Sequence, residues 1–127
     1  KLDFSNLIRK NHTIECRINA EDAKDFSPSP GNVKFINIPG GRGVRVDTAL
    51  YTNYKVNPHY DSLVLKLISK GKDRNESISI MKRALNEIII DGINTNIELH
   101  KWILNQKDFV NGIYNTNWLE KNIAKFN

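Results

Sequence analysis

An arginine set among acidic residues is the feature of this sequence best suited to chemistry. The segment HTIECRINAED (12–22) places Glu15 two residues before Arg17, and a second acidic pair, Glu21 and Asp22, follows it. A guanidinium is always charged and presents a rigid fork of donors. The pattern therefore indicates either a solvated polar face or an arginine that acts on a bound group, and the spacing alone leaves both open.

Other side chains that could do chemistry are sparse. His12 and Cys16 lie four residues apart, but a metal site typically needs three or four ligands. A packed cysteine and a hydrogen-bonded histidine are the favoured interpretation, and we predict no metal site. His59 lies near Asp61, His100 lies in a predicted helix, and no serine or cysteine is placed for a catalytic triad.

The composition is that of an ordinary folded domain. The chain has 127 residues, of which 39% are hydrophobic and 26% charged, enough for one domain with a modest core. The formal net charge of +5 could favour an anionic partner. The lysines and arginines are scattered rather than clustered, however, so we expect no nucleic-acid partner.

The cysteine content and the hydropathy bear on the compartment. Cys16 is the only cysteine, which excludes an intrachain disulfide and agrees with a reducing compartment. No apolar run approaches the roughly 20 residues that span a bilayer, and no signal-peptide pattern opens the chain. We therefore expect a cytoplasmic protein without membrane contact. Because the chain begins with lysine rather than methionine, we expect it to be a piece of a longer protein.

Strand patterns occupy the first half of the chain. They cover 12–19, 32–38, 44–51 and 62–71, with turns predicted at FSPSPG (26–31) and PGGRG (39–43). In the first strand, Ile14, Cys16 and Ile18 fall on one side and Arg17 on the other. The last strand is apolar on both faces, which predicts a central strand covered on two sides. The glycines of 39–43 could cradle a phosphate, but no helical pattern follows them, so a hairpin turn is favoured.

Helical patterns occupy the second half. Asp73 with Glu76 predicts a helix start, Thr95 with Glu98 a capping box, and Thr116 the cap of a last short helix. The apolar stripe of the first helix and the two tryptophans are expected in the core: Ile78, Met81, Ala84, Leu85, Ile88, Trp102 and Trp118. Strands followed by helices predict an α+β fold, with helices packed on an antiparallel sheet. On the residues alone, a basic binding module and part of an enzyme both remain open.

A series of motifs carries a more specific signal. The series comprises IECRINAED (14–22), F-x-P-S-P-G (26–31), PGG-x-GVR (39–45), YD-S-L (60–63), K-L (66–67), M-x-x-AL-x-E (81–87), I-x-GI-x-TN (90–96) and T-x-W-L-E (116–120). In this order and spacing it resembles the C-terminal part of biotin carboxylase, the ATP-dependent component of acetyl-CoA carboxylase and of related biotin-dependent carboxylases. The resemblance covers nearly the whole chain.

The resemblance implies a division of labour within a longer enzyme. Residues 1–11 would be the lead-in from a missing ATP-grasp region, and 12–127 the biotin carboxylase C-terminal domain. ATP and magnesium would be bound by the parent enzyme outside this fragment, which we therefore expect to be inactive alone. The carboxyltransferase subunits and the biotin carboxyl carrier protein are the implied partners, and the parent enzyme is expected to be a homodimer. Arg42 and Arg45 are expected at its interface, although bacterial members often have phenylalanine where this chain has Arg42.

The resemblance also gives Arg17 a role. The family activates bicarbonate with ATP as carboxyphosphate, which breaks down to CO2 and phosphate, and the ureido nitrogen of biotin attacks the CO2. The arginine of this motif is assigned to biotin and bicarbonate binding and to stabilising negative charge on the ureido oxygen. Asp61, ahead of Glu15, is the candidate acid for orienting the guanidinium, although a structural salt bridge is the favoured interpretation for either acid.

The resemblance leaves the acyl acceptor open. The first half-reaction of acetyl-CoA carboxylase, in fatty acid synthesis, is the leading hypothesis, and the end of the chain soon after the last predicted helix favours a separate subunit. The same region of a pyruvate, propionyl-CoA or urea carboxylase is the enzyme alternative. A basic binding module is the non-enzyme alternative, which would require salt-sensitive binding to DNA or RNA.

Overall fold

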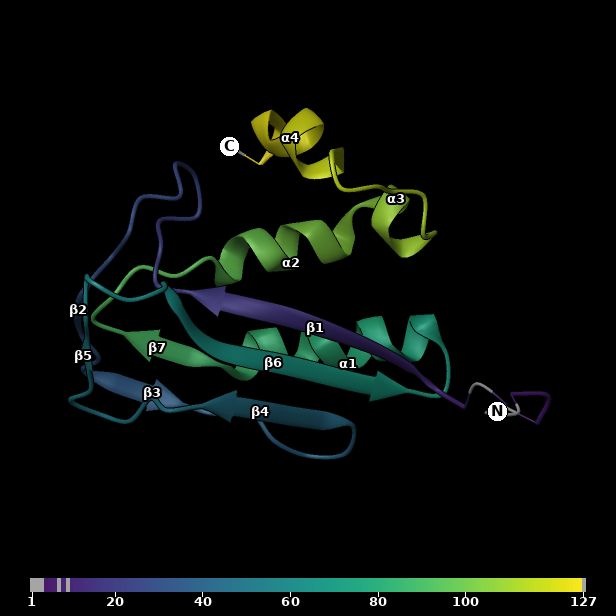
Figure 1. Ribbon diagram of the computed structural model, residues 1–127, viewed down its shortest axis with the longest axis horizontal. Helices are drawn as coiled ribbons and strands as arrows, with labels where there is room; N and C mark the ends of the chain where they lie inside the picture. The colour runs from purple at the N-terminus through teal and green to yellow at the C-terminus, as the bar shows by residue number, and fades with distance from the viewer. Residues whose placement is uncertain (1–3, 7, 9, 127) are drawn as a thin grey trace.

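A three-stranded antiparallel sheet backed by a long helix forms the centre of the computed structural model, which describes residues 4–6, 8 and 10–126 (Figure 1). The sheet has the order β1 (His12–Asn19), β6 (Leu63–Gly71), β4 (Val44–Thr48). The helix is α1 (Arg74–Glu87), which follows β6 directly. The α+β prediction and the central place of the 62–71 strand are confirmed.

Alternation along the strands decides which side chains enter the core. Cys16 pairs with Leu67 and Ile18 with Leu65, and all four side chains are buried. They pack on the predicted apolar stripe of α1, from which Met81 and Leu85 are fully buried. On the opposite face of β6, Val64, Lys66 and Ile68 are only half-buried and Lys70 is exposed, so the predicted cover on the second side is partial.

The connection from β6 to α1 is tight because the chain reverses against its own strand. The Asp73 carboxylate accepts a 2.9 Å hydrogen bond from the Glu76 N–H, and the Glu76 side chain accepts from the Lys72 N–H. This confirms the helix start predicted at Asp73. Behind it, the buried hydroxyls of Ser69 and Ser77 lie 3.0 Å apart, joining strand and helix.

The prediction of one continuous strand over 32–38 is wrong. The structure has β2 (Gly31–Asn32) and β3 (Phe35–Asn37), which pair with β5 (Lys55–Val56) and β7 (Ile89–Asp91) in two separate two-stranded sheets. Between β2 and β3 the backbone changes partner: the Val33 N–H donates to the Tyr54 carbonyl at 2.9 Å, and the Lys34 N–H to the Asp91 carbonyl at 2.7 Å.

The prediction of a hairpin turn at 39–43 is also wrong. The turn at these residues joins β3 to β4, which lie in different sheets, so it carries the chain from one sheet to another. The strand predicted to reach Tyr51 stops at Thr48. The Thr48 hydroxyl donates to the Val64 carbonyl at 2.8 Å and accepts from the Leu50 N–H at 3.0 Å, which turns the backbone out of the sheet.

Two predicted helix caps are displaced. The N-cap position of α2 (Ile97–Asn105) is Asn96 rather than Thr95, and that of α4 (Trp118–Asn122) is Asn117 rather than Thr116. Neither asparagine side chain makes a capping hydrogen bond to its own helix. The Asn96 side chain is used for a contact with β1 instead of its own helix. The sequence patterns also missed β7, α3 (Lys107–Val110) and the short 3-10 helix η1 (Ile123–Lys125).

One arginine of α1 holds the C-terminal segment. The Arg74 guanidinium lies 4.8 Å from the ring centre of Phe109 and 5.6 Å from that of Tyr114, and it donates to the Phe109 and Val110 carbonyls. It also contacts His12 Nε2 at 3.2 Å. The two tryptophans pack against each other at 5.9 Å but are only half-buried, so their predicted place in the core is only partly realised.

The predicted lead-in is described only in part. Residues 1–3, 7 and 9 of the predicted lead-in lie outside the described residues, and Phe4 and Ile8 are exposed. Among the helices of the described ranges, none is long and apolar enough to cross a bilayer.

The close approach of α1 to β6 predicts that Gly71→Ala destabilises the fold. An added Cβ would lie 2.5 Å from the Ser77 backbone nitrogen, so strand and helix must separate. We expect a loss of about 1–3 kcal/mol in the free energy of unfolding, measured by urea denaturation. Gly40→Ala is the matched control, because no atom lies within 4 Å of its added Cβ. Equal effects of the two substitutions would contradict the close packing.

Candidate functional site

Arg17 lies on the outer face of the main sheet, the face turned away from α1. Its strand neighbours Cys16 and Ile18 are buried on the inner face, so alternation places Arg17 outside, where its side chain is exposed. It is paired with Lys66 on β6, and Lys66 is paired in turn with Asp47 on β4. Three charged residues from three strands therefore form one row across this face.

The neighbouring row completes a patch of mixed charge. Glu15 pairs with Ile68, and Ile68 with Arg45. Arg45 binds its own strand neighbour Asp47 through two hydrogen bonds of 2.9 and 3.0 Å. These bonds, together with the positive charges of Arg45 and Lys66, hold the pKa of the Asp47 carboxyl below its usual range. Asp47 is therefore already engaged by Arg45, at the far edge of the sheet from Arg17.

The acidic residues that could pair with Arg17 bind other groups. The Asp61 carboxylate accepts from the Leu63 N–H at 2.7 Å, and the Asp22 carboxylate accepts from the Lys24 N–H at 2.9 Å. Glu21 accepts hydrogen bonds from the Ser62 hydroxyl and the Asn19 amide. Within the described ranges, no ion pair joins Arg17 to any of these carboxylates or to Glu15. The guanidinium is therefore available to a bound group.

The backbone of Arg17, in contrast, is firmly held. Its carbonyl oxygen accepts a 3.2 Å hydrogen bond from the Asn96 amide and a 2.9 Å contact from His100 Nε2. Both residues come from the start of α2, about 80 positions further along the chain. Sequence patterns missed this contact, because an asparagine at a helix start is ordinarily explained as a cap and no local period reports a partner so distant.

Burial controls the charge of His100. Burial lowers the pKa of His100 below its ordinary value, and the hydrogen bond to the Arg17 carbonyl opposes this only in part. A carbonyl oxygen can only accept, so Nε2 carries the hydrogen and the neutral ring can make this bond. His100 is thus suited to hold a backbone group as a neutral donor.

The other candidates from the sequence have structural roles. Burial raises the pKa of the Cys16 thiol to about 12, so it remains protonated and unreactive at neutral pH. His12 contacts Arg74, as expected for a hydrogen-bonded histidine. In the part of the chain that the structure describes, no group of three or more His, Cys, Asp or Glu side chains is placed to hold a metal ion.

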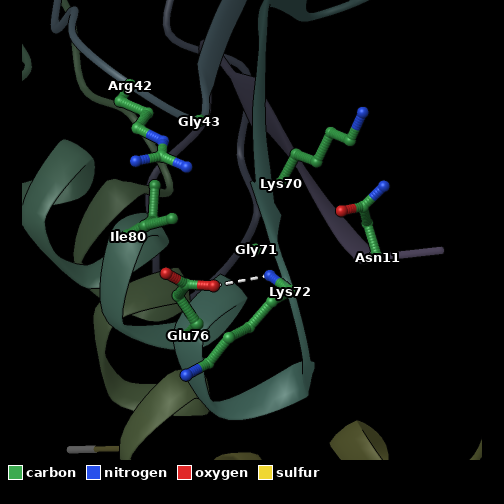
Figure 2. A pocket seen from close by; sticks show the side chains of 8 residues that line it. All are labelled: Asn11, Arg42, Gly43, Lys70, Gly71, Lys72, Glu76 and Ile80. Atoms are coloured by element: carbon green, nitrogen blue, oxygen red, sulfur yellow. Dashed lines mark hydrogen bonds between the residues drawn. The ribbon is translucent and has the colours of Figure 1, made fainter.

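Arg42 and Arg45 lie at the turn into β4 and on that strand, and both are exposed. Arg42 borders a pocket of about 590 Å³ between this turn, the end of β6 and the first turns of α1, drawn in Figure 2. The pocket is lined by Asn11, Arg42, Gly43, Lys70, Gly71, Lys72, Glu76 and Ile80. The Arg42 guanidinium points towards Ile80, and Lys70 and Asn11 lie on the opposite side of the pocket (Figure 2). Arg42 and Arg17 therefore serve different surfaces of the domain.

This arrangement is suited to stabilising a developing negative charge. An exposed guanidinium with no partner in the described chain, fixed at its backbone, needs little rearrangement to receive an oxyanion. Lys66 adjoins it in the same row and adds positive potential.

Comparison with known sequences gives this geometry a context. A family model described as the biotin carboxylase C-terminal domain matches residues 15–121. Biotin carboxylase of Pseudomonas aeruginosa is 52% identical over 119 residues, which cover 94% of this chain and 26% of that protein. A pyruvate carboxylase subunit of Methanothermobacter thermautotrophicus is 48% identical over 113 residues, which cover 88% of this chain and 23% of that protein.

A solved structure shows the same fold. It is the biotin carboxylase domain dimer of Hydrogenobacter thermophilus 2-oxoglutarate carboxylase, in complex with MgADP, ADP and bicarbonate. The TM-score is 0.89 at 39% identity, over 93% of this chain and 26% of that one. The chain thus spans about a quarter of the length of the relatives it matches.

The lowered pKa of His100 predicts an acid-side loss of stability. Below pH 6.5, the ordinary value, the unfolded chain takes up this proton more readily than the folded chain, so the contribution of His100 is complete above that pH and declines below it. We expect His100→Gln, which cannot titrate, to lose less stability than the wild type between pH 7.5 and 5.5 in urea denaturation. Equal losses in the two proteins would contradict the shift.

Proposed function

The chain belongs to the family of biotin carboxylase C-terminal domains, and on this premise we propose that it forms part of an ATP-dependent enzyme that carboxylates biotin with bicarbonate. The biotin would be carried by a biotin carboxyl carrier protein. The observation that supports this proposal is the Arg17 guanidinium, exposed on the sheet and without an ion pair in the described chain, at the position of the family's motif arginine.

Arg17 would act by electrostatic stabilisation. When biotin loses its ureido proton, negative charge gathers on the ureido oxygen, and a rigid cationic fork binds such an oxygen more strongly as the charge grows. The same fork can hold bicarbonate. Asp61 and Glu15 would help to orient the guanidinium once the rest of the enzyme is present, and their exposure leaves room for that role.

Other steps fall to regions outside this chain. ATP and magnesium would be bound by the remaining three quarters of the parent enzyme, so this chain alone would not turn over. Carboxyltransferase subunits would receive the carboxyl group downstream. The first half-reaction of acetyl-CoA carboxylase in the cytoplasm is the leading assignment, since a biotin carboxylase is among the more similar relatives. A pyruvate carboxylase is the alternative, favoured by the Methanothermobacter relative.

A homodimer is also part of the proposal. The structurally similar 2-oxoglutarate carboxylase domain is described as a dimer, and Arg42 and Arg45 are exposed at the outer sheet edge and its turn. Interfaces of this kind are sensitive to charge, because a reversed charge meets the wrong sign on the partner.

Substitution of Arg17 tests the proposed role. In the complete enzyme, Arg17→Ala should reduce biotin-dependent ATP cleavage by about 100- to 1000-fold, the loss typical of one electrostatic donor. Arg17→Lys should recover only part of it, since an ammonium lacks the fork. Arg83→Ala is the control, because Arg83 forms a surface ion pair with Glu87 on α1. Unchanged turnover in Arg17→Ala would refute the proposed role.

Charge reversal tests the interface. Arg45→Glu in the complete enzyme places a second carboxylate beside Asp47 and should raise the dimer dissociation constant by about tenfold or more, measured by sedimentation velocity. Lys121→Glu changes the net charge equally on the exposed face of α4, away from β4 and its turn (Figure 1), and serves as the control. A dimer as tight as the wild type in Arg45→Glu would remove Arg45 from the interface.

A further inference from the structure

We propose that Asn96 and His100 of α2 are positioning residues that set the place of the Arg17 guanidinium by holding the backbone of its strand. The inference rests on the proposed function of Arg17. Its basis is the convergence of two side chains, from one distant helix, on the carbonyl oxygen of Arg17.

The edge of the sheet makes this contact necessary. In the sheet order β1-β6-β4, β1 has β6 on one side only, so its other edge presents unpaired backbone groups. Buried or half-buried backbone groups need hydrogen-bond partners. At this edge the start of α2 lies beside the end of β1 (Figure 1), and its side chains supply partners for the Arg17 carbonyl and the Asn19 N–H in place of a fourth strand.

Asn96 takes the place of a strand residue. Its backbone N–H donates to the Asn19 carbonyl at 3.3 Å, its Oδ1 accepts from the Asn19 N–H at 2.9 Å, and its Nδ2 donates to the Arg17 carbonyl at 3.2 Å. The residue is only 8% exposed. These three bonds fix both ends of the Arg17–Asn19 segment.

His100 adds a second hydrogen bond to the backbone of Arg17. Its neutral Nε2–H donates to the same Arg17 carbonyl at 2.9 Å, so this oxygen uses both lone pairs on α2. The pairing of β1 with β6 becomes irregular between Ile18 and Asn19, one residue beyond Arg17. Pairing with β6 therefore fixes this end of β1 less well than a regular ladder would, and α2 completes the restraint.

A small shift of the Arg17–Asn19 backbone would move the Arg17 guanidinium as well. A misplacement of about 1 Å at a catalytic group can cost on the order of 100-fold in rate. The restraint is therefore expected to act on turnover rather than on ATP binding, which lies elsewhere in the parent enzyme.

A double-mutant cycle in the complete enzyme tests the proposal. His100→Leu and Asn96→Asp each remove one donor to the Arg17 carbonyl, and Asn96→Asp keeps the acceptor for the Asn19 N–H. Each should lower kcat of biotin-dependent ATP cleavage by about tenfold or more while leaving KM for ATP unchanged. His100→Gln, which keeps an N–H donor, should restore most of the loss. In an Arg17→Ala background, His100→Leu should cause little further loss.

The controls separate positioning from stability. Glu98→Gln alters α2 on its exposed side, where Glu98 pairs with Lys101, and should leave kcat unchanged. The amide nitrogen of Ile18 shares a peptide group with the Arg17 carbonyl, so its ¹⁵N shift should move in His100→Leu and return in His100→Gln.

The outcomes distinguish the two claims. Unchanged turnover in Arg17→Ala defeats the proposed function itself. If Arg17→Ala loses much of its turnover but Asn96→Asp and His100→Leu lose none, only the positioning role is overturned. The same holds if His100→Leu lowers turnover equally in the wild type and in the Arg17→Ala background. If His100→Leu does not fold, wild-type kcat in Asn96→Asp still overturns it, and a selective fall in kcat supports it.

Discussion

The pairing of β1 with β6, with one face buried against α1, is the constraint on which the rest of the domain depends. Burial of Cys16 and Ile18 sends Arg17 to the outer face, because strand side chains alternate. A slip of one residue would bury the guanidinium and expose the two apolar side chains, at a cost of several kcal/mol. The packing that stabilises the fold therefore also presents the charged group to which we assign the proposed chemistry.

Neighbouring elements pack against the three-stranded sheet and supply partners at its edge. On the β1 edge, α2 replaces a strand with the Asn96 and His100 side chains. Beyond the sheet, the chain between β2 and β3 changes partner to join two small sheets, and Gly92 permits this approach. An added Cβ at Gly92 would lie 2.2 Å from the Asn32 carbonyl oxygen, and its φ of +100° disfavours other residues.

Local periodicity predicted the strands and the helix whose form is decided by which side chains are buried. The alternation of 12–19, the central strand of 62–71 and the stripe led by Met81 are all present. Periodicity could not predict the break at Val33 or the contacts of Asn96, because these depend on partners that lie far away in the sequence. The exposed position of Arg17 also follows from alternation. Its proposed chemical role rests on the resemblance to a family, since one exposed arginine has the same pattern as a solvated face.

Chemical rescue is the most direct test that the Arg17 guanidinium acts on the reacting group. Biotin-dependent ATP cleavage by the complete enzyme carrying Arg17→Ala would be measured with increasing concentrations of guanidinium ion, in parallel with the wild type and Arg83→Ala. Turnover is expected to rise with guanidinium and to saturate in Arg17→Ala only. The role of Arg17 would be contradicted if Arg17→Ala kept its fold but guanidinium did not raise its low rate, and if Arg17→Gln restored turnover. A neutral amide cannot supply the missing charge, so restored turnover in Arg17→Gln would show that the charge is not required.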